Sequence, residues 1–177
     1  MNSDSLVITA LGEDRPGLIA QLSHVINEAM CNIQDSRMSV LGGEFAILMQ
    51  VSGKWNNLAK LETNLHHLQE SSGLTIISKR TVPRRLDGNK IPYTIEVVSL
   101  DHPGIVSQLA EYLSAKSINV HDMVSSSQPA PHTGSPIFTL NMTVEIPADL
   151  HIATLRDEFM DFCETLNLDA VIEPYKP

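Results

Sequence analysis

Apolar and polar positions alternate along this chain in an order that occurs twice. In the first half, strand-like runs and helix-like spacing follow one another at 6–11 (strand), 18–29 (helix), 35–41 (strand), 45–51 (strand), 58–68 (helix) and 74–77 (strand). The second half repeats this order at 93–100, 105–113, 120–126, 138–144, 152–162 and 168–172. These patterns predict an α+β protein with two tandem ferredoxin-like βαββαβ domains. Each domain is expected to pack two helices on one face of an antiparallel four-stranded sheet.

The repeat is also visible in the residues themselves. Asp14–Leu18 reads DRPGL and Asp101–Ile105 reads DHPGI, each between a predicted strand and a predicted helix. The second copy carries an insertion of about six residues within 128–135, where the first half has the tight Gly42-Gly43 hairpin signal. We therefore expect domains at 1–82 and 93–177, joined by a polar linker at 83–92.

The two predicted sheets differ on the side that the helices leave open. The strand at 45–51 places Ala46 and Leu48 there, whereas the corresponding strand of the second half places Thr139, Asn141 and Thr143 there. A partly apolar sheet surface is stabilised when another protein surface packs on it and excludes water. We expect the open face or edge of the first half to be covered, by the other half or by a second subunit in a homodimer.

Composition narrows the class of protein. The chain has 177 residues and a formal net charge of −9, without the basic stripe that a DNA-binding module needs to contact phosphates. No apolar run is long enough for a membrane span, and the start of the chain does not read as a secretion signal. The two cysteines have no metal-binding or disulfide spacing. We expect a cytoplasmic protein with no direct nucleic-acid contact, no membrane segment and no cofactor.

The repeated turn has two interpretations. In the structural one, Asp14 and Asp101 cap the following helices, proline occupies the first turn, and glycine allows the bend. In the functional one, the helix N-terminus presents unpaired N–H groups to a small carboxylate, with Gly17 and Gly104 allowing close approach. The aspartate accepts a hydrogen bond from an ammonium group. Carboxylate and ammonium together describe an amino acid.

The two turns are not equivalent, because Arg15 is always charged whereas His102 is only partly charged near neutral pH. Unequal affinities are therefore expected. Asn32 and Asn119 are predicted to end the first helix of each half, either as left-handed caps or as side-chain donors to a ligand. No GxSxG, HExxH or Walker-type motif is present, and no third ligand joins Glu62 and His66, so neither a catalytic site nor a metal site is predicted.

The strand, the Asp-Arg-Pro-Gly-Leu turn, the helix and the following Asn-Ile, repeated within two βαββαβ patterns, resemble the ACT domain, a regulatory module that binds amino acids. The resemblance implies a protein without enzyme activity that responds to an amino acid, with glycine the expected ligand. More specifically, Leu6–Gly12 before the turn, Cys31–Arg37 after the helix and Leu41–Phe45 at the hairpin resemble the ACT proteins that regulate glycine cleavage. This sharper resemblance implies repression of the glycine cleavage operon through binding of a DNA-binding transcriptional activator. The implied ligand-binding residues are Asp14, Arg15, Gly17, Leu18 and Asn32, with Asp101, His102, Gly104, Ile105 and Asn119 in the second copy.

Two alternatives remain open on the sequence. The chain could be a regulatory ACT subunit, or a detached regulatory region, of a folate or amino-acid metabolic enzyme. It could also bind operator DNA directly, although its charge argues against this.

Overall fold

The computed structural model describes residues 4–82 and 88–176, and the chain divides into two compact units, Met1–Arg85 and Leu86–Pro177. The described part of the first unit contains β1 (Asp4–Glu13), α1 (Leu18–Glu28), β2 (Asn32–Leu41), β3 (Glu44–Gly53), α2 (Trp55–Ser72) and β4 (Thr75–Thr81). That of the second unit contains β5 (Lys90–Leu100), α3 (Ile105–Ala115), β6 (Asn119–Pro129), β7 (Pro136–Pro147), α4 (Ile152–Thr165) and β8 (Asp169–Pro174).

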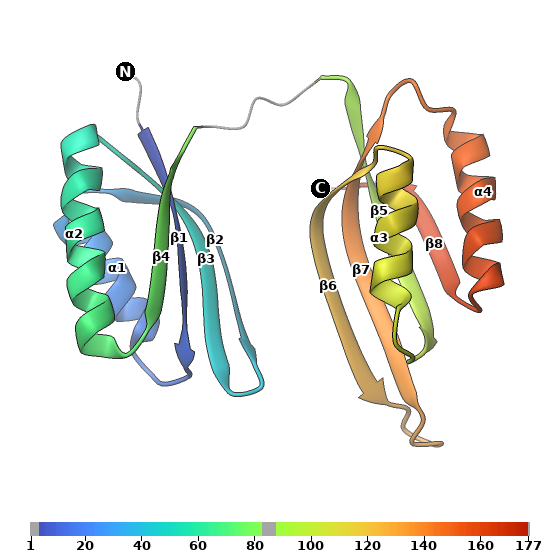
Figure 1. The fold of residues 1–177 in the computed structure, drawn as a ribbon, viewed down its shortest axis with the longest axis horizontal. Coiled ribbons are helices and arrows are strands. Elements are labelled where there is room, and N and C mark those ends of the chain that lie inside the picture. Colours follow the sequence, from blue (N-terminus) through green and yellow to red (C-terminus); the bar gives the residue numbers. More distant parts are fainter. Residues whose placement is uncertain (1–3, 83–87, 177) are drawn as a thin grey trace. The chain divides into compact units, whose positions relative to one another are not determined.

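Each unit forms one antiparallel sheet, in the order β2-β3-β1-β4 in the first unit and β6-β7-β5-β8 in the second. In both, the pair of helices covers one face of the sheet and leaves the other face open (Figure 1). The predicted fold class is therefore confirmed. The first and third strands of each unit become its two central strands because the two βαβ crossovers interleave.

Alternation along the strands and helical spacing create the two cores. In β1, Leu6, Ile8 and Ala10 are buried against the helices, and they meet Leu22 of α1 and Leu58 of α2 in one cluster. The core of the second unit is built in the same way, with Phe159 among its largest fully buried side chains. Each unit thus buries an apolar core of its own, which is the main source of its stability.

The segment expected as a linker is only partly a connection. Residues 83–87 lie outside the described residues, while β5 begins at Lys90 and contains Pro92. Pro92 fits in this strand because pairing of β5 with β8 starts only at Tyr93, so the missing N–H removes no ladder bond to β8. Placing 90–92 in the linker was wrong, since proline here stands at a strand end and does not break the strand.

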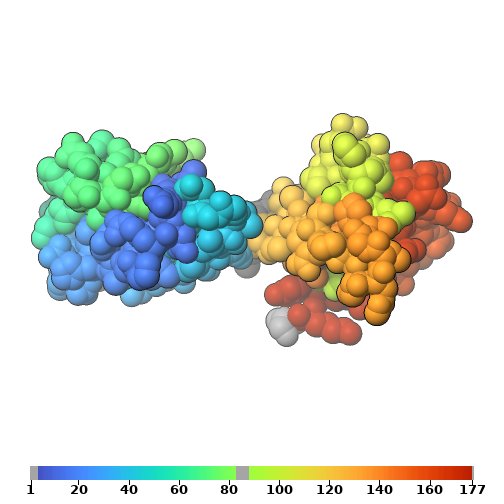
Figure 2. Space-filling view, turned by 90° about the horizontal axis from the view of Figure 1, so that it is seen from below, coloured from blue at the N-terminus to red at the C-terminus, as the bar shows by residue number. Residues whose placement is uncertain are grey.

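The hairpins differ as the sequence predicts. Gly42 and Gly43 both have positive φ, 62° and 89°, as a tight two-residue turn requires. In the second unit β6 ends at Pro129 and β7 starts at Pro136, so the inserted residues form a longer loop. In each unit this hairpin is hydrogen-bonded to the repeated turn, Asp14–Gly17 or Asp101–Gly104, which we call the DxPG turn. Asp14 N–H donates to Gly43 O at 3.0 Å, and Asp101 N–H donates to Pro136 O at 2.9 Å. The blue and cyan surfaces of the first unit accordingly adjoin at this end (Figure 2).

Candidate functional site

The DxPG turns end in glycines that themselves start the helices. Gly17 is the N-cap of α1 with φ 96°, and Gly104 is the N-cap of α3 with φ 102°, both in the left-handed region. No side-chain cap is present at either helix start in the described structure. The prediction that Asp14 and Asp101 cap these helices was therefore wrong. Each aspartate lies three residues before the N-cap, and its proline lies before the helix, not in its first turn.

Without a side-chain cap, the first helical N–H groups have no partner within the helix. The first hydrogen bond of α1 runs from Gln21 N–H to Gly17 O at 2.9 Å, and that of α3 runs from Gln108 N–H to Gly104 O at 3.0 Å. The preceding N–H groups, from residue 18 to 20 and from 105 to 107, therefore lie in the free end of a helix. This end also carries the positive pole of the helix dipole.

A hollow opens over each of these helix ends. The first has a volume of about 490 Å³ and is lined by residues 14–20 together with Met38 and Phe45. The second has a volume of about 500 Å³ and is lined by Asp101, His102, residues 104–107, Ala110 and Phe138. A side chain at Gly17 would meet nothing within 4 Å, so this glycine is required by its positive φ and not by crowding. Both hollows combine N–H donors with a largely apolar wall, which suits a small anion with little side chain.

The basic residues of the two turns have different surroundings. Arg15 donates from Nη2 to Ser72 O at 3.2 Å, so its guanidinium lies at the C-terminal end of α2 while the residue still lines the first hollow. His102 places Nδ1 3.2 Å from Pro103 O, within its own turn. The lining of the first hollow therefore includes an arginine, and that of the second includes a histidine.

Asn32 and Asn119 lie away from the turn of their own unit. Both are the first residues of strands, β2 and β6, and are not helix caps as predicted. Asn32 is opposite Ser52, whose neighbour on β1 is Ser5, and the turn begins at Asp14, nine residues further along the chain. At about 3.4 Å per residue, roughly 31 Å of strand separates Asn32 from the turn. Asn119 instead donates from Nδ2 to Glu145 at 3.2 Å. The structure brings the turn residues together but does not bring either asparagine to them.

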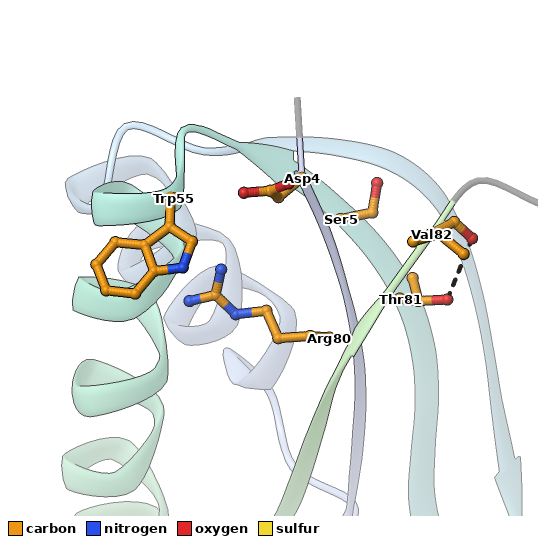
Figure 3. A pocket seen from close by; sticks show the side chains of 6 residues that line it. All are labelled: Asp4, Ser5, Trp55, Arg80, Thr81 and Val82. Atoms are coloured by element: carbon orange, nitrogen blue, oxygen red, sulfur yellow. Dashed lines mark hydrogen bonds between the residues drawn. The ribbon is translucent and has the colours of Figure 1, made fainter. Parts of the chain in front are cut away.

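A third hollow, of about 470 Å³, lies at the opposite end of the first unit and was not predicted. Its lining is formed by Asp4, Ser5, Trp55, Arg80, Thr81 and Val82 (Figure 3). The Arg80 guanidinium lies 5.8 Å from the centre of the Trp55 ring and donates two hydrogen bonds, of 2.8 and 2.9 Å, to Glu62. The residues come from three separate segments of the chain, so no local sequence motif marks this hollow.

Removing the Glu62 carboxylate is expected to weaken the first unit only above acidic pH. The hydrogen bonds from Arg80 lower the pKa of Glu62 from its usual 4.5, so the pair stabilises the fold above that value. The stabilisation is lost as pH falls through the lowered folded-state pKa. Because both side chains are about a third exposed, Glu62→Gln should cost only about 0.5–1 kcal/mol at pH 7. Thermal unfolding at pH 7 and pH 3 tests this, since the difference from wild type should be smaller at pH 3 than at pH 7.

Glu70→Gln is the matched control, because Glu70 lies on the same helix with its side chain 76% exposed. It should leave the unfolding temperature unchanged at both pH values. An equal loss in the two variants would mean that the Arg80 pair contributes nothing beyond general surface charge.

Residues 4–82 and 88–176 contain no group of three His, Cys, Asp or Glu side chains placed to hold a metal ion. Within the same ranges, no helix has the length and apolar character needed to cross a membrane.

Comparisons with known proteins agree with this geometry. A family model described as an ACT domain matches residues 4–78. The glycine cleavage system transcriptional repressor of Escherichia coli (strain K12) is 32% identical over 167 residues, covering 94% of this chain and 88% of that protein. A crystal structure provisionally described as a glycine cleavage system transcriptional repressor is 27% identical, with a TM-score of 0.75 and 100% of both chains covered. A protein from Galdieria sulphuraria, 24% identical over 99% of this chain and 100% of its own, shares the fold with a TM-score of 0.81.

Proposed function

Because this chain belongs to the family of the glycine cleavage system transcriptional repressor, a family of regulatory ACT proteins, we propose that it is a glycine-responsive repressor of the glycine cleavage operon. It acts indirectly, by binding a DNA-binding transcriptional activator, and it catalyses no reaction. The observation that carries this proposal is the match over 94% of the chain, which includes both DxPG turns.

The ligand half of the proposal rests on the first turn. The N–H groups of residues 18–20 face the carboxylate of the amino acid, and Arg15 adds positive charge at the rim. Asp14 offers its carboxylate to the ammonium group. Glycine needs no side-chain pocket, so the apolar wall formed with Met38 and Phe45 excludes water without having to recognise a side chain.

The size of glycine limits its affinity. With five non-hydrogen atoms and a ceiling of about −1.5 kcal/mol per atom, its binding free energy is no better than roughly −7.5 kcal/mol. This corresponds to micromolar binding at best. A site of this affinity is suited to sensing a metabolite. Glycine shifts the equilibrium between the free chain and the partner-bound chain only by the difference between its affinities for these two states.

The proposal that the chain acts through a protein partner rests on its negative net charge. A chain with net charge −9 repels the DNA backbone and lacks cations in the number that operator binding requires. The basic surface of a DNA-binding activator is, in contrast, complementary to it. Repression through a protein is therefore the physically favoured route.

A capture experiment tests both halves. Immobilised full-length chain, incubated with cell lysate, is expected to retain a DNA-binding protein, identified by mass, and to release it in millimolar glycine but not in millimolar glutamate. The purified chain alone should not retard operator DNA in a gel. Retardation by the chain alone, or capture that is indifferent to glycine, would overturn the proposal.

A further inference from the structure

The hollow at the first turn has a wall on its sheet side that the second hollow lacks. Phe45 of β3 lines the first hollow, and Phe138 of β7 lines the second at the equivalent position of the repeat. The first hollow is also lined by Met38, which lies on β2, an outer strand of its sheet (Figure 1). Among the residues that the structure describes, none from the equivalent strand β6 lines the second hollow.

Strand register shows which residue of the second unit corresponds to Met38. Met38 pairs with Ile47 of β3, and Ser125 pairs with Leu140 of β7. Ile47 and Leu140 each lie two residues after the phenylalanine that lines the hollow, so Met38 and Ser125 occupy the same place in the repeated fold. The two units therefore differ at this place by a long apolar side chain against a short polar one.

The fold itself does not require methionine at this place. Met38 is 48% exposed and does not belong to the apolar core that the described residues of the first unit form. The serine at the same place of the second unit leaves the strand and its pairing intact. Methionine is unbranched and flexible, so its side chain adapts to the surface of a small molecule. The residue is therefore free to shape the hollow that it lines.

The position of Met38 matters for the α-carbon of the ligand. In the function proposed above, on which this step rests, the amino acid places its carboxylate at the helix start and its ammonium group at Asp14. The lining that remains beyond the turn and the start of α1 consists of Met38 and Phe45. This wall faces the α-carbon, where glycine has only hydrogens and larger amino acids have a side chain.

We propose that Met38 makes the first turn selective for glycine, by excluding amino acids that carry a side chain. A methyl group on the α-carbon has to displace the methionine or move the carboxylate away from the helix start. One methyl or methylene group in an apolar pocket changes affinity by roughly 10–200-fold. Because the methionine side chain is flexible and half-exposed, we expect selectivity near the lower end of that range.

Calorimetry on the full-length chain with glycine, L-alanine and D-alanine tests this. All proteins carry Val106→Glu, which places a negative charge at the second turn so that binding at the first is measured. With Met38 present, each alanine should bind at least about tenfold more weakly than glycine. Met38→Ala should bring one enantiomer to within about threefold of glycine, because the wall covers one side of the α-carbon. Met38→Leu keeps a large apolar side chain and should keep the selectivity.

Val40→Ala is the matched control. Val40 lies two residues further along β2, on the same side of the sheet, and is 43% exposed. It is not among the residues that line the first hollow. The change should leave the ratio of the glycine and alanine affinities as it is with Met38 present. Thermal unfolding checks that each variant is folded.

The role of Met38 and the proposed function fail in different ways. If glycine binds but Met38→Ala leaves the selectivity unchanged, Met38 does not select the ligand, whereas glycine sensing stands. Equal binding of glycine and both alanines with Met38 present has the same meaning. A loss of selectivity in Val40→Ala as large as in Met38→Ala also overturns the proposal, since a general loosening of β2 then explains both. Without any heat from millimolar glycine in the Val106→Glu protein, the first turn binds no ligand and both proposals fall.

Discussion

Replacing Phe159 with alanine is expected to lower the free energy of unfolding of the second unit by about 3–5 kcal/mol. Phe159 lies on α4, is 1% exposed, and contacts the Tyr112 ring at a centroid distance of 5.6 Å. Its removal loses the transfer free energy of the ring and leaves a cavity that the surrounding sheet and helices fill only in part. A domain of this size is stable by only about 5–15 kcal/mol, so the loss is a large share of the total.

Cys163 provides a probe for this change. It belongs to the same core and is fully buried, and burial raises its pKa to about 11. At pH 8 the thiol is therefore both shielded and protonated, and it reacts only when this part of the core opens. In a Cys31→Ser background, Phe159→Ala should speed labelling of Cys163 at least about a hundredfold, since 1.36 kcal/mol corresponds to a factor of ten. Denaturant unfolding gives the global value independently of any local opening near the thiol.

Two controls define the result. Leu65→Ala changes the equivalent core position in the first unit, which is 2% exposed, and should cost about 2–5 kcal/mol there without speeding Cys163 labelling comparably. Val171→Ala changes an exposed residue of β8 and should cost less than about 0.5 kcal/mol. A loss below about 1 kcal/mol for Phe159→Ala would mean that the core around it is loosely packed.

The sequence was sufficient to predict the strands, the helices and the tight hairpin, because each depends on spacing within a short segment. Leu6, Ile8 and Ala10 alternate in β1 as a half-buried strand must, and Gly42 and Gly43 adopt the positive φ that their hairpin needs. The repeat reinforced these predictions, since the same pattern in two places is difficult to obtain by chance.

The helix ends were predicted less well, because side-chain identity there was a poor guide. The chain leaves α1 through Met30 with φ 55° and leaves α3 through Ser117 with φ 58°, so the left-handed residue is neither glycine nor asparagine. The N–H of the following residue then reaches back five residues, from Cys31 to Ile26 O and from Ile118 to Leu113 O. The side chain of Ile118, directly after the bend, is buried in the core, and this packing stabilises the left-handed conformation. The motif thus depends on packing after the helix, and the asparagines two residues beyond the bend already belong to strands.

The candidate site shows the same division between local and distant information. The two turns could be found from their own residues, and both open into a hollow at a helix start. The distance of Asn32 from its turn depends on strand register across β1, β2 and β3, which no short segment specifies. The group formed by Trp55, Glu62 and Arg80 likewise depends on how α2 lies over β4.

Placing a carboxylate at the first helix start is expected to weaken glycine binding strongly while preserving the fold. Ile19 lines the hollow, is 46% exposed, and lies in the first turn of α1, which contains no acidic residue. Ile19→Glu introduces a negative charge where the carboxylate of glycine is proposed to bind. At about 5 Å and an effective dielectric constant of about 20, the repulsion is about 3 kcal/mol, so affinity should fall by at least tenfold even after screening. The same charge favours the helix dipole, so the unfolding temperature should be unchanged or slightly higher.

Val106→Glu makes the equivalent change in the second turn, since Val106 lines the second hollow. Calorimetry with glycine on the wild type and both variants then assigns the binding turn. With Arg15 at the first rim and His102 at the second, the Ile19 variant should lose the tighter binding, and the Val106 variant should lose at most a weaker second event. If both variants bind glycine as the wild type does, neither helix start holds the ligand carboxylate. The free N–H groups of the two turns are then features of the fold alone, and glycine, if it acts on this chain, must bind elsewhere.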